Sequence, residues 1–152
     1  MSIKKINLTK DSFVPIFVGL ILRLINFNSP IVGVHSWRQA DTAAMARHFF
    51  LNDTPIWLPQ IDWSGPTSGF VESEFPIFPY LVAQLYKIFG INESIGRGLS
   101  IFFSVLTILL IINLGSQLYD AKTGWWAGMF FAFTPITIYY GRSFQAESLL
   151  LF

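Results

Sequence analysis

The sequence predicts an all-α, polytopic integral membrane protein, and three observations carry that prediction. Of its 152 residues, 53% are hydrophobic and only 12% are charged, whereas a soluble domain has about 25% charged residues. The mean hydropathy is +0.52. Residues 99–118 form an apolar run without a charge, and its length matches the ~20 residues that a spanning helix needs. Water is therefore not the only solvent of this chain.

The first expected span covers residues 12–27, although Arg23 lies within it. We expect the Arg23 side chain to snorkel to the nearer interface. Lysines at positions 4, 5 and 10 precede the span and resemble the basic start of a signal peptide, but no small-residue cleavage site follows. The segment is thus predicted to be an uncleaved anchor rather than a cleaved signal, with the N-terminus in the cytoplasm.

The long segment 28–98 then lies on the outer side, and two helices are expected within it. Ser36 and Gln39 fit a capping box, so a helix is predicted over Trp37–Leu51. A second helix, predicted over Pro76–Phe89, begins with a proline and is followed by a glycine, as helices often are. Its expected apolar face, suited to lying flat in the membrane interface, consists of Phe78, Leu81, Val82, Leu85 and Phe89.

Two further spans are expected after the outer segment. The run at 99–118 returns to the cytoplasm, and a turn at 120–122 leads into a span over 124–140. That span has aromatic pairs at both ends, as interfacial belts do, and Pro135 is expected to kink it. A fourth apolar run starts near 146 and ends in SLLLF. We expect residues 1–152 to be the N-terminal part of one longer membrane domain; a short terminal anchor is the alternative.

Composition excludes some classes of binding partner and ligand. The net charge of +1 and the absence of a basic patch argue against nucleic acid. The chain has no cysteine, which excludes disulfides and thiolate metal sites. The two histidines lie thirteen positions apart and form no metal motif. The outer side holds most of the acids, so Asp41, Glu74 and Glu147 are expected to meet at one membrane face.

Asp41 is the first candidate for chemistry, because a carboxylate on a capped helix at a membrane surface can act as a general base. The alternative is an ordinary helix ion pair with Arg38, three residues earlier. Glu74 is a further candidate, for which the alternative is that its charge complements the start of the next helix. Glu147 lies close to hydrocarbon and needs a function or a partner, for which Arg142 is available.

Two arginines and three tryptophans are further candidates. Arg97 and Arg142 lie at the outer ends of spans, where forked guanidinium donors suit a phosphate; anchoring at lipid headgroups is the alternative. The tryptophans at positions 37, 57 and 63 either face a sugar or lie in the membrane interface.

The order of HSWRQAD, EFPIFPY and YYGRSFQAES along the chain resembles the GT-C membrane glycosyltransferases, specifically the family 39 group of protein mannosyltransferases and aminoarabinose transferases. The resemblance covers the N-terminal part of that family. It implies transfer of a sugar from a polyprenyl-phosphate carrier to an acceptor hydroxyl on the outer face of the plasma (inner) membrane, with inversion. It also implies that spans beyond residue 152 complete the lipid channel, so that the fragment alone is inactive.

The resemblance also implies roles for individual residues. Asp41 takes the place of the acid that activates the acceptor, while Arg97 and Arg142 would stabilise the lipid phosphate. Residues that would bind substrate or line the site are Glu74, Glu147, Arg38, His35 and Trp37. No cofactor is implied with certainty, although the acids could share a divalent cation.

One departure from the family pattern concerns the acceptor. Protein mannosyltransferases carry adjacent acids in this loop, whereas Thr42 follows Asp41 here. That difference favours a lipid or a growing cell-envelope glycan over a protein acceptor. A transporter or flippase and a non-catalytic assembly subunit remain as rival functions, because intramembrane charges and broken spans occur in transporters too.

Overall fold

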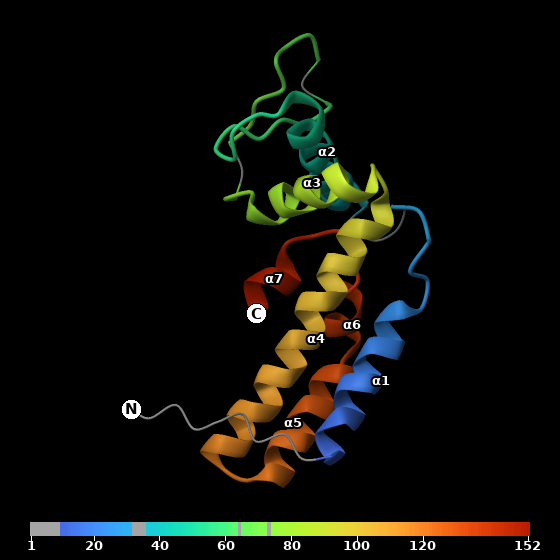
Figure 1. Cartoon of the computed structure of the whole chain (residues 1–152), viewed down its shortest axis with the longest axis vertical. Helices are drawn as coiled ribbons and strands as arrows, with labels where there is room; N and C mark the ends of the chain where they lie inside the picture. Colours follow the sequence, from blue (N-terminus) through green and yellow to red (C-terminus); the bar gives the residue numbers. More distant parts are fainter. Residues whose placement is uncertain (1–9, 32–35, 64, 73) are drawn as a thin grey trace. The chain divides into compact units, whose positions relative to one another are not determined.

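The chain folds into helices, and the isolated bridge between Gln60 and Phe70 is the one β-type pairing among the residues described. The computed structural model describes residues 10–31, 36–63, 65–72 and 74–152. Figure 1 follows the elements along the chain, which are the short 3-10 helix η1 (Lys10–Ser12), α1 (Phe13–Leu24), α2 (Ser36–Asn52), α3 (Ile77–Phe89), α4 (Glu93–Leu118), α5 (Ala121–Phe133), α6 (Pro135–Tyr140) and α7 (Glu147–Leu151). The prediction of an all-α fold is confirmed.

Two compact units make up the chain. The first unit comprises Met1–Asn26, Ile101–Arg142 and Glu147–Phe152, and the second comprises Phe27–Ser100 and Ser143–Ala146. Helix α4 therefore contributes residues 93–100 to the second unit and residues 101–118 to the first.

Helix α4 contains the predicted span at 99–118 and begins earlier, at Glu93. Asn92 caps this start, since its Oδ1 accepts a hydrogen bond from the Ser94 N–H at 2.8 Å. Within the described part of the chain, α4 alone is long and apolar enough to cross a bilayer. Helix α1 has 12 residues, or about 18 Å at ~1.5 Å per residue, so it is shorter than the span expected over 12–27.

The span predicted over 124–140 is two helices rather than one kinked helix. Thr134 is extended (ψ 123°) and separates α5 from α6, because a proline disfavours the helical conformation in the residue before it. Pro135 also lacks the N–H that would bond to the carbonyl of Phe131. The Thr137 hydroxyl donates to that carbonyl instead, at 2.5 Å, which leaves the break satisfied.

Arg23 is fully buried in the first unit, so the prediction that it snorkels to an interface is wrong. Its guanidinium donates to Ser104 Oγ at 2.7 Å and to the carbonyls of Ala132 at 3.3 Å and Thr137 at 3.2 Å. These two carbonyls lie on either side of the α5–α6 break. Arg23 on α1 thus supplies a donor to the Ala132 carbonyl at the break, whereas the Thr137 carbonyl also accepts from the Gly141 N–H.

Glycines let the helices of the first unit approach closely. Gly124 of α5 lies against the backbone of α4, and a Cβ added at Gly115 would lie 2.8 Å from the Gly124 Cα. Gly128 is packed against the side chain of Ile112. Gly124 and Gly128 form a G-x-x-x-G pattern, which brings membrane helices into backbone contact.

The second unit is built on the packing of α2 against α3. The rings of Phe49 and Tyr80 meet edge to face with centroids 5.5 Å apart, and those of Phe50 and Tyr86 at 6.2 Å. Burial raises the pKa of the Tyr86 hydroxyl to about 12, and the nearby charge of Glu93 adds to that effect. Both helices agree with their predicted ranges to within one residue at each end.

The predicted apolar face of α3 is only partly right. Phe78 and Val82 are buried, but Leu81 and Phe89 are exposed and Leu85 is half-buried. The buried side continues instead through Ala83 and Tyr86, because α2 covers that side of the helix. Pro76 is the N-cap rather than the first helical residue, and Gly90 ends the helix with φ +78°, a conformation suited to glycine.

Candidate functional site

Asp41 lies on α2, and a residue of the following loop orients its carboxylate. Its carboxylate oxygen Oδ1 accepts a hydrogen bond from the indole Nε1 of Trp63 at 3.0 Å. Asp41 is half-buried, one turn after the start of α2. The carboxylate is thus oriented by a neutral donor while it stays accessible from solvent.

Arg38 pairs with Glu74, the acid that precedes α3. The Nη2 atom of Arg38 lies 3.0 Å from Glu74 Oε1, and the two side chains are 43% and 67% exposed. An exposed pair of this kind contributes little to stability, about 0–1 kcal/mol. The pair therefore brings two charged groups to the same surface of the second unit as Asp41 without locking them there.

The loop that carries Trp63 is attached to α2 through Asp62. Its carboxylate accepts hydrogen bonds from Arg47 Nη2 at 2.6 and 2.7 Å and lies 2.8 Å from His48 Nε2. Burial alone would raise the pKa of Asp62, but the hydrogen bonds and charges of His48 and Arg47 outweigh it and lower the pKa below 3.8. Asp62 thus fixes the loop immediately before Trp63.

A second attachment continues from the same face of α2. The Asn52 side chain donates to Gln60 Oε1 at 2.8 Å, and Gln60 in turn donates to the Ser68 carbonyl at 2.6 Å. Backbone bonds from Ile61 to Gly69 and from Val71 to Pro59 close the loop on itself. These bonds hold residues 59–61 against residues 68–71, and Trp63 follows shortly after the first of these segments.

Three sequence motifs that lie far apart in the chain meet in the second unit. Gln39 accepts a hydrogen bond from the backbone N–H of Phe144 at 3.1 Å, and the Phe144 ring lies edge to face with Phe78, centroids 6.0 Å apart. Gly96 of α4 packs directly against the Phe144 ring, and Ser100 donates to the Ser143 carbonyl at 2.6 Å. Gln39 of HSWRQAD, Phe78 of EFPIFPY and Phe144 of GRSFQAE thus pack together in the second unit.

Arg97 and Arg142, the predicted phosphate ligands, each contact the protein backbone. Arg97 is 7% exposed and donates to the carbonyls of residues 27 and 30 and to Ser29 Oγ at 3.0–3.2 Å. Arg142 in the first unit donates to the Ile25 carbonyl at 2.6 Å, which satisfies the end of α1. Phosphate binding by either guanidinium stays a prediction.

Three other candidates have different outcomes. Trp37 is 66% exposed on α2. Glu147 belongs to the first unit, at the start of α7, so its expected meeting with Asp41 and Glu74 stays a prediction. His35 lies outside the described residues. Over the ranges that are described, no group of three or more metal-ligating side chains comes together. A divalent cation shared by the acids stays a prediction.

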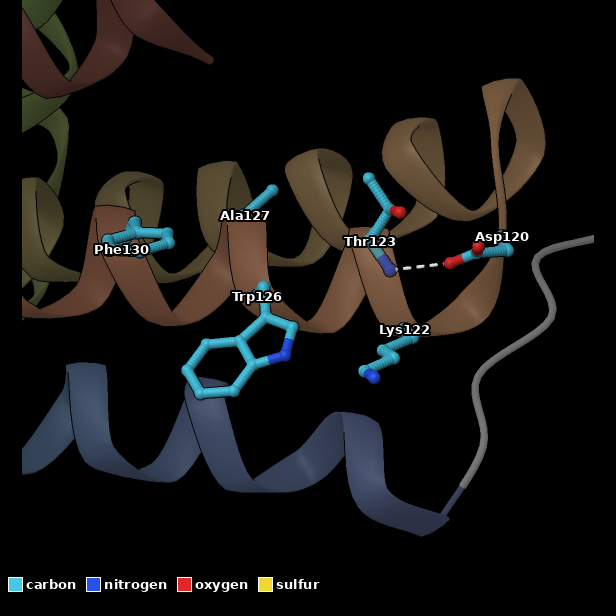
Figure 2. A pocket seen from close by; sticks show the side chains of 6 residues that line it. All are labelled: Asp120, Lys122, Thr123, Trp126, Ala127 and Phe130. Carbon is cyan, nitrogen blue, oxygen red and sulfur yellow. Dashed lines mark hydrogen bonds between the residues drawn. The ribbon is translucent and has the colours of Figure 1, made fainter.

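A shallow pocket of the first unit holds none of the predicted site residues. Figure 2 shows it at the start of α5, and its lining residues are Asp120, Lys122, Thr123, Trp126, Ala127 and Phe130. Asp120 Oδ1 accepts the Thr123 N–H at 2.7 Å, as the dashed line in Figure 2 marks, and this bond lowers the Asp120 pKa. The Asp120 carboxylate thus caps the start of α5.

Sequence reasoning missed the residues that orient the site. Trp63 lies 22 positions from Asp41 and Phe144 lies 105 positions from Gln39, and no local pattern reports contacts at that separation. Gln39 was expected in a capping box, whereas its oxygen accepts from Phe144. The close approach of α5 to α4 could have been predicted, because the sequence has a G-x-x-x-G motif at 124–128.

Similarity to one known protein family covers more than half of the chain. No curated protein and no solved structure matches it significantly. The sequence profile of the family described as dolichyl-phosphate-mannose-protein mannosyltransferase matches residues 73–152, more than half of the chain. The match covers α3 through α7, and with it Glu74, both predicted phosphate arginines and the GRSFQAE motif. The resemblance first suggested by the sequence motifs is thereby confirmed, and the chain belongs to this family of membrane glycosyltransferases.

Proposed function

We propose that Asp41 is the general base of a membrane glycosyltransferase that moves a sugar from a polyprenyl-phosphate carrier to an acceptor hydroxyl. The observation that carries this proposal is the placement of Asp41. It is half-exposed, oriented by Trp63 at 3.0 Å, and carried on the helix whose Gln39 packs with Phe144, a residue of the segment that matches the family.

The proposed reaction is a single in-line displacement. Asp41 takes the proton from the acceptor hydroxyl as the acceptor oxygen attacks the anomeric carbon. The bond between that carbon and the phosphate oxygen breaks, and the lipid phosphate leaves with the electron pair. Configuration at the anomeric carbon is inverted because attack and departure occur on opposite faces.

The remaining roles are assigned from charge and placement. Arg38, Glu74 and Trp37 share the second unit with Asp41 and would contact sugar or acceptor, together with His35. Arg97 or Arg142 would stabilise the departing phosphate, since guanidinium donors match its oxygens, and Glu147 would bind substrate. The acceptor would be a lipid or a glycan, because Thr42 stands where protein mannosyltransferases carry a second acid.

The proposed setting is a multi-pass inner-membrane protein with a cytoplasmic N-terminus. Residues 28–98 would lie on the outer face, and residues near 12–27, 99–118 and 124–140 would cross the membrane, with α5, the break and α6 together spanning the last of these ranges. Residues 1–152 would form the N-terminal part of one GT-C membrane domain. Charge supports the orientation, since Lys4, Lys5 and Lys10 precede the first apolar helix.

The test is transfer by the full-length protein, of which residues 1–152 are proposed to be the N-terminal part, in proteoliposomes supplied with radiolabelled polyprenyl-phosphate sugars and a lipid and glycan extract. Asp41→Asn keeps an oxygen that can accept from Trp63 but removes the base, so transfer should fall by about 10²–10⁴-fold. Asp53→Asn is the matched control: Asp53 is an acid of the same unit that pairs with Lys87 at 2.9 Å, and this variant should transfer normally.

Two results would contradict the proposal. Transfer by Asp41→Asn at the wild-type rate would move the base to another acid, such as Glu74 or Glu147. Movement of the donor across the membrane without transfer to any acceptor would favour a flippase. Thermal melting of each variant in detergent separates loss of chemistry from loss of folding.

A further inference from the structure

Two exposed indole rings flank the proposed base. Trp63 is 73% exposed although its Nε1 is hydrogen-bonded to Asp41, and Trp37 is 66% exposed. Trp37 lies four residues before Asp41 on α2, a spacing that puts both side chains on one face of the helix. Large aromatic side chains left in solvent around a polar group mark a binding surface more often than a core.

The hydrogen bond decides what Trp63 can offer a ligand. Its one donor, the indole N–H, is directed at the Asp41 carboxylate. What remains exposed is the ring itself, whose faces carry negative charge density and attract weakly positive C–H groups. A ligand that fits would therefore present C–H groups to the ring and a hydroxyl to Asp41.

We infer that Trp37 and Trp63 form a platform for the acceptor, and that the acceptor is a saccharide; this inference rests on the proposed function. One face of a pyranose ring carries axial C–H groups and its rim carries hydroxyls. Stacking on an indole would direct a rim hydroxyl to Asp41, and the exposed Arg38–Glu74 pair would bind neighbouring hydroxyls.

The charged surroundings favour a saccharide over lipid. A tryptophan that anchors a protein in the membrane interface keeps its N–H available to headgroups and water, whereas Trp63 directs that group to a carboxylate. Three charged side chains, Asp41, Arg38 and Glu74, accompany the rings, and such groups bind hydroxyls better than acyl chains.

Binding can be measured without donor or turnover, by 19F NMR of the protein labelled with 5-fluorotryptophan. The chain has five tryptophans, which single substitutions assign. The probes are the methyl pyranosides of glucose, mannose and galactose, with open-chain mannitol as the control for hydroxyls without a ring. The resonances of Trp37 and Trp63 should shift with at least one pyranoside and not with mannitol. Trp57 is 71% exposed in the same loop and is the internal control, which should not move.

Two outcomes of the titration would overturn the inference. One is that no pyranoside moves Trp37 or Trp63. The other is that Trp57 moves with them, or that lipid vesicles shift all three, which would identify the surface as a membrane contact. Either outcome leaves the Asp41→Asn transfer result untouched, so failure here is distinct from failure of the proposed function.

A pair of variants separates stacking from orientation of the base. Trp63→Phe keeps an aromatic face without the N–H, and Trp63→Ala removes both. If the acceptor stacks on Trp63, the Trp63→Ala variant should raise KM for a saccharide acceptor by ~3–10-fold, and the Trp63→Phe variant should raise it less. If both variants lower kcat equally and leave KM unchanged, Trp63 acts only by positioning Asp41 and the platform is refuted.

Discussion

Single side chains far apart in the sequence decide how the candidate site is assembled. Asp62 joins the loop to α2 through Arg47 and His48, and the next residue, Trp63, reaches Asp41. The loop would still be ordered without Asp62, because Asn52, Gln60 and the backbone bonds also hold it. Asp62 therefore adjusts the position of Trp63 more than it maintains the fold.

The lowered pKa of Asp62 predicts a pH dependence with a definite sign. The folded state holds this proton less tightly than the unfolded chain, so the stabilisation is complete above the ordinary pKa of 3.8 and is lost as pH falls through the lowered value. Asp62→Asn should lower the melting temperature slightly at pH 7, by less than about 1 kcal/mol in stability since the pair is exposed. The two proteins should converge as pH falls from 3.8 through the lowered value.

Melting curves in detergent between pH 2.5 and 7 check this prediction. Glu72→Gln serves as the control, because Glu72 is an exposed acid of the same loop. A difference between wild type and Asp62→Asn that persists unchanged at the lowest pH would contradict the assigned role of the carboxylate.

At this scale the sequence predicts residue types better than partners. The sequence indicates Asp41, Arg38, Glu74 and Trp37 as candidates by their residue type and position. The expected alternative for Arg38 was the acid three residues later, and the structure pairs it with Glu74, 36 positions away. Such pairing depends on how α2 and α3 pack, which local spacing does not encode.

At the scale of elements, helix ranges follow from capping and hydrophobicity, while helix faces follow from neighbours. The ends of α3 were predicted to within one residue, since Pro76 and Gly90 act locally. Its buried side was only partly predicted, because apolar residues surround most of the helix and α2 determines which of them are covered. The α5–α6 break was expected as a kink, and the satisfied carbonyls make a complete interruption tolerable.

The close contact of α4 and α5 predicts a steric effect at Gly124. A valine there would collide with the backbone of α4 near Ile112 and Ser116. Overpacking of this kind costs about 1–3 kcal/mol, so Gly124→Val should lower the melting temperature in detergent by roughly 5 °C. Ala121→Val, at the exposed first position of α5, is the matched control. Equal melting of the two variants would show that the helices are not in backbone contact.

At the scale of the whole molecule, the proposed membrane topology can be tested with single cysteines. The chain contains no cysteine, so a single introduced cysteine reports its own location without a background. Glu72→Cys lies in the segment proposed to be outside, and Lys122→Cys lies in the turn proposed to be cytoplasmic.

Labelling with a membrane-impermeant maleimide in sealed right-side-out vesicles tests this topology. Position 72 should react at once, and position 122 should react only after the vesicles are opened with detergent. The cysteine-free parent should not react in either condition. Rapid labelling of position 122 in sealed vesicles would refute the proposed orientation.

The overall class could be predicted because hydropathy and composition act over the whole chain. The low charge, the uncharged run in α4 and the order of the motifs sufficed to identify a helical membrane glycosyltransferase family. The division into two units could not be predicted, because it depends on Ser143–Ala146 leaving the last helices and packing with α2 and α3. Four residues are too few to show a hydrophobic periodicity from which their packing partners could be predicted.

The burial of Arg23 has a consequence for biogenesis. Its partners Ser104 and Thr137 are synthesised 81 and 114 residues later, a delay of roughly 6–23 s for the second at about 5–20 residues per second. During that interval the Arg23 guanidinium has only the Gly19 carbonyl of its own helix among these partners, and a charged side chain within a membrane span is costly until it is paired. We therefore expect α1 to stay at the insertion machinery until α4, α5 and α6 have been synthesised. The hydrophobic helices would then enter the lipid together.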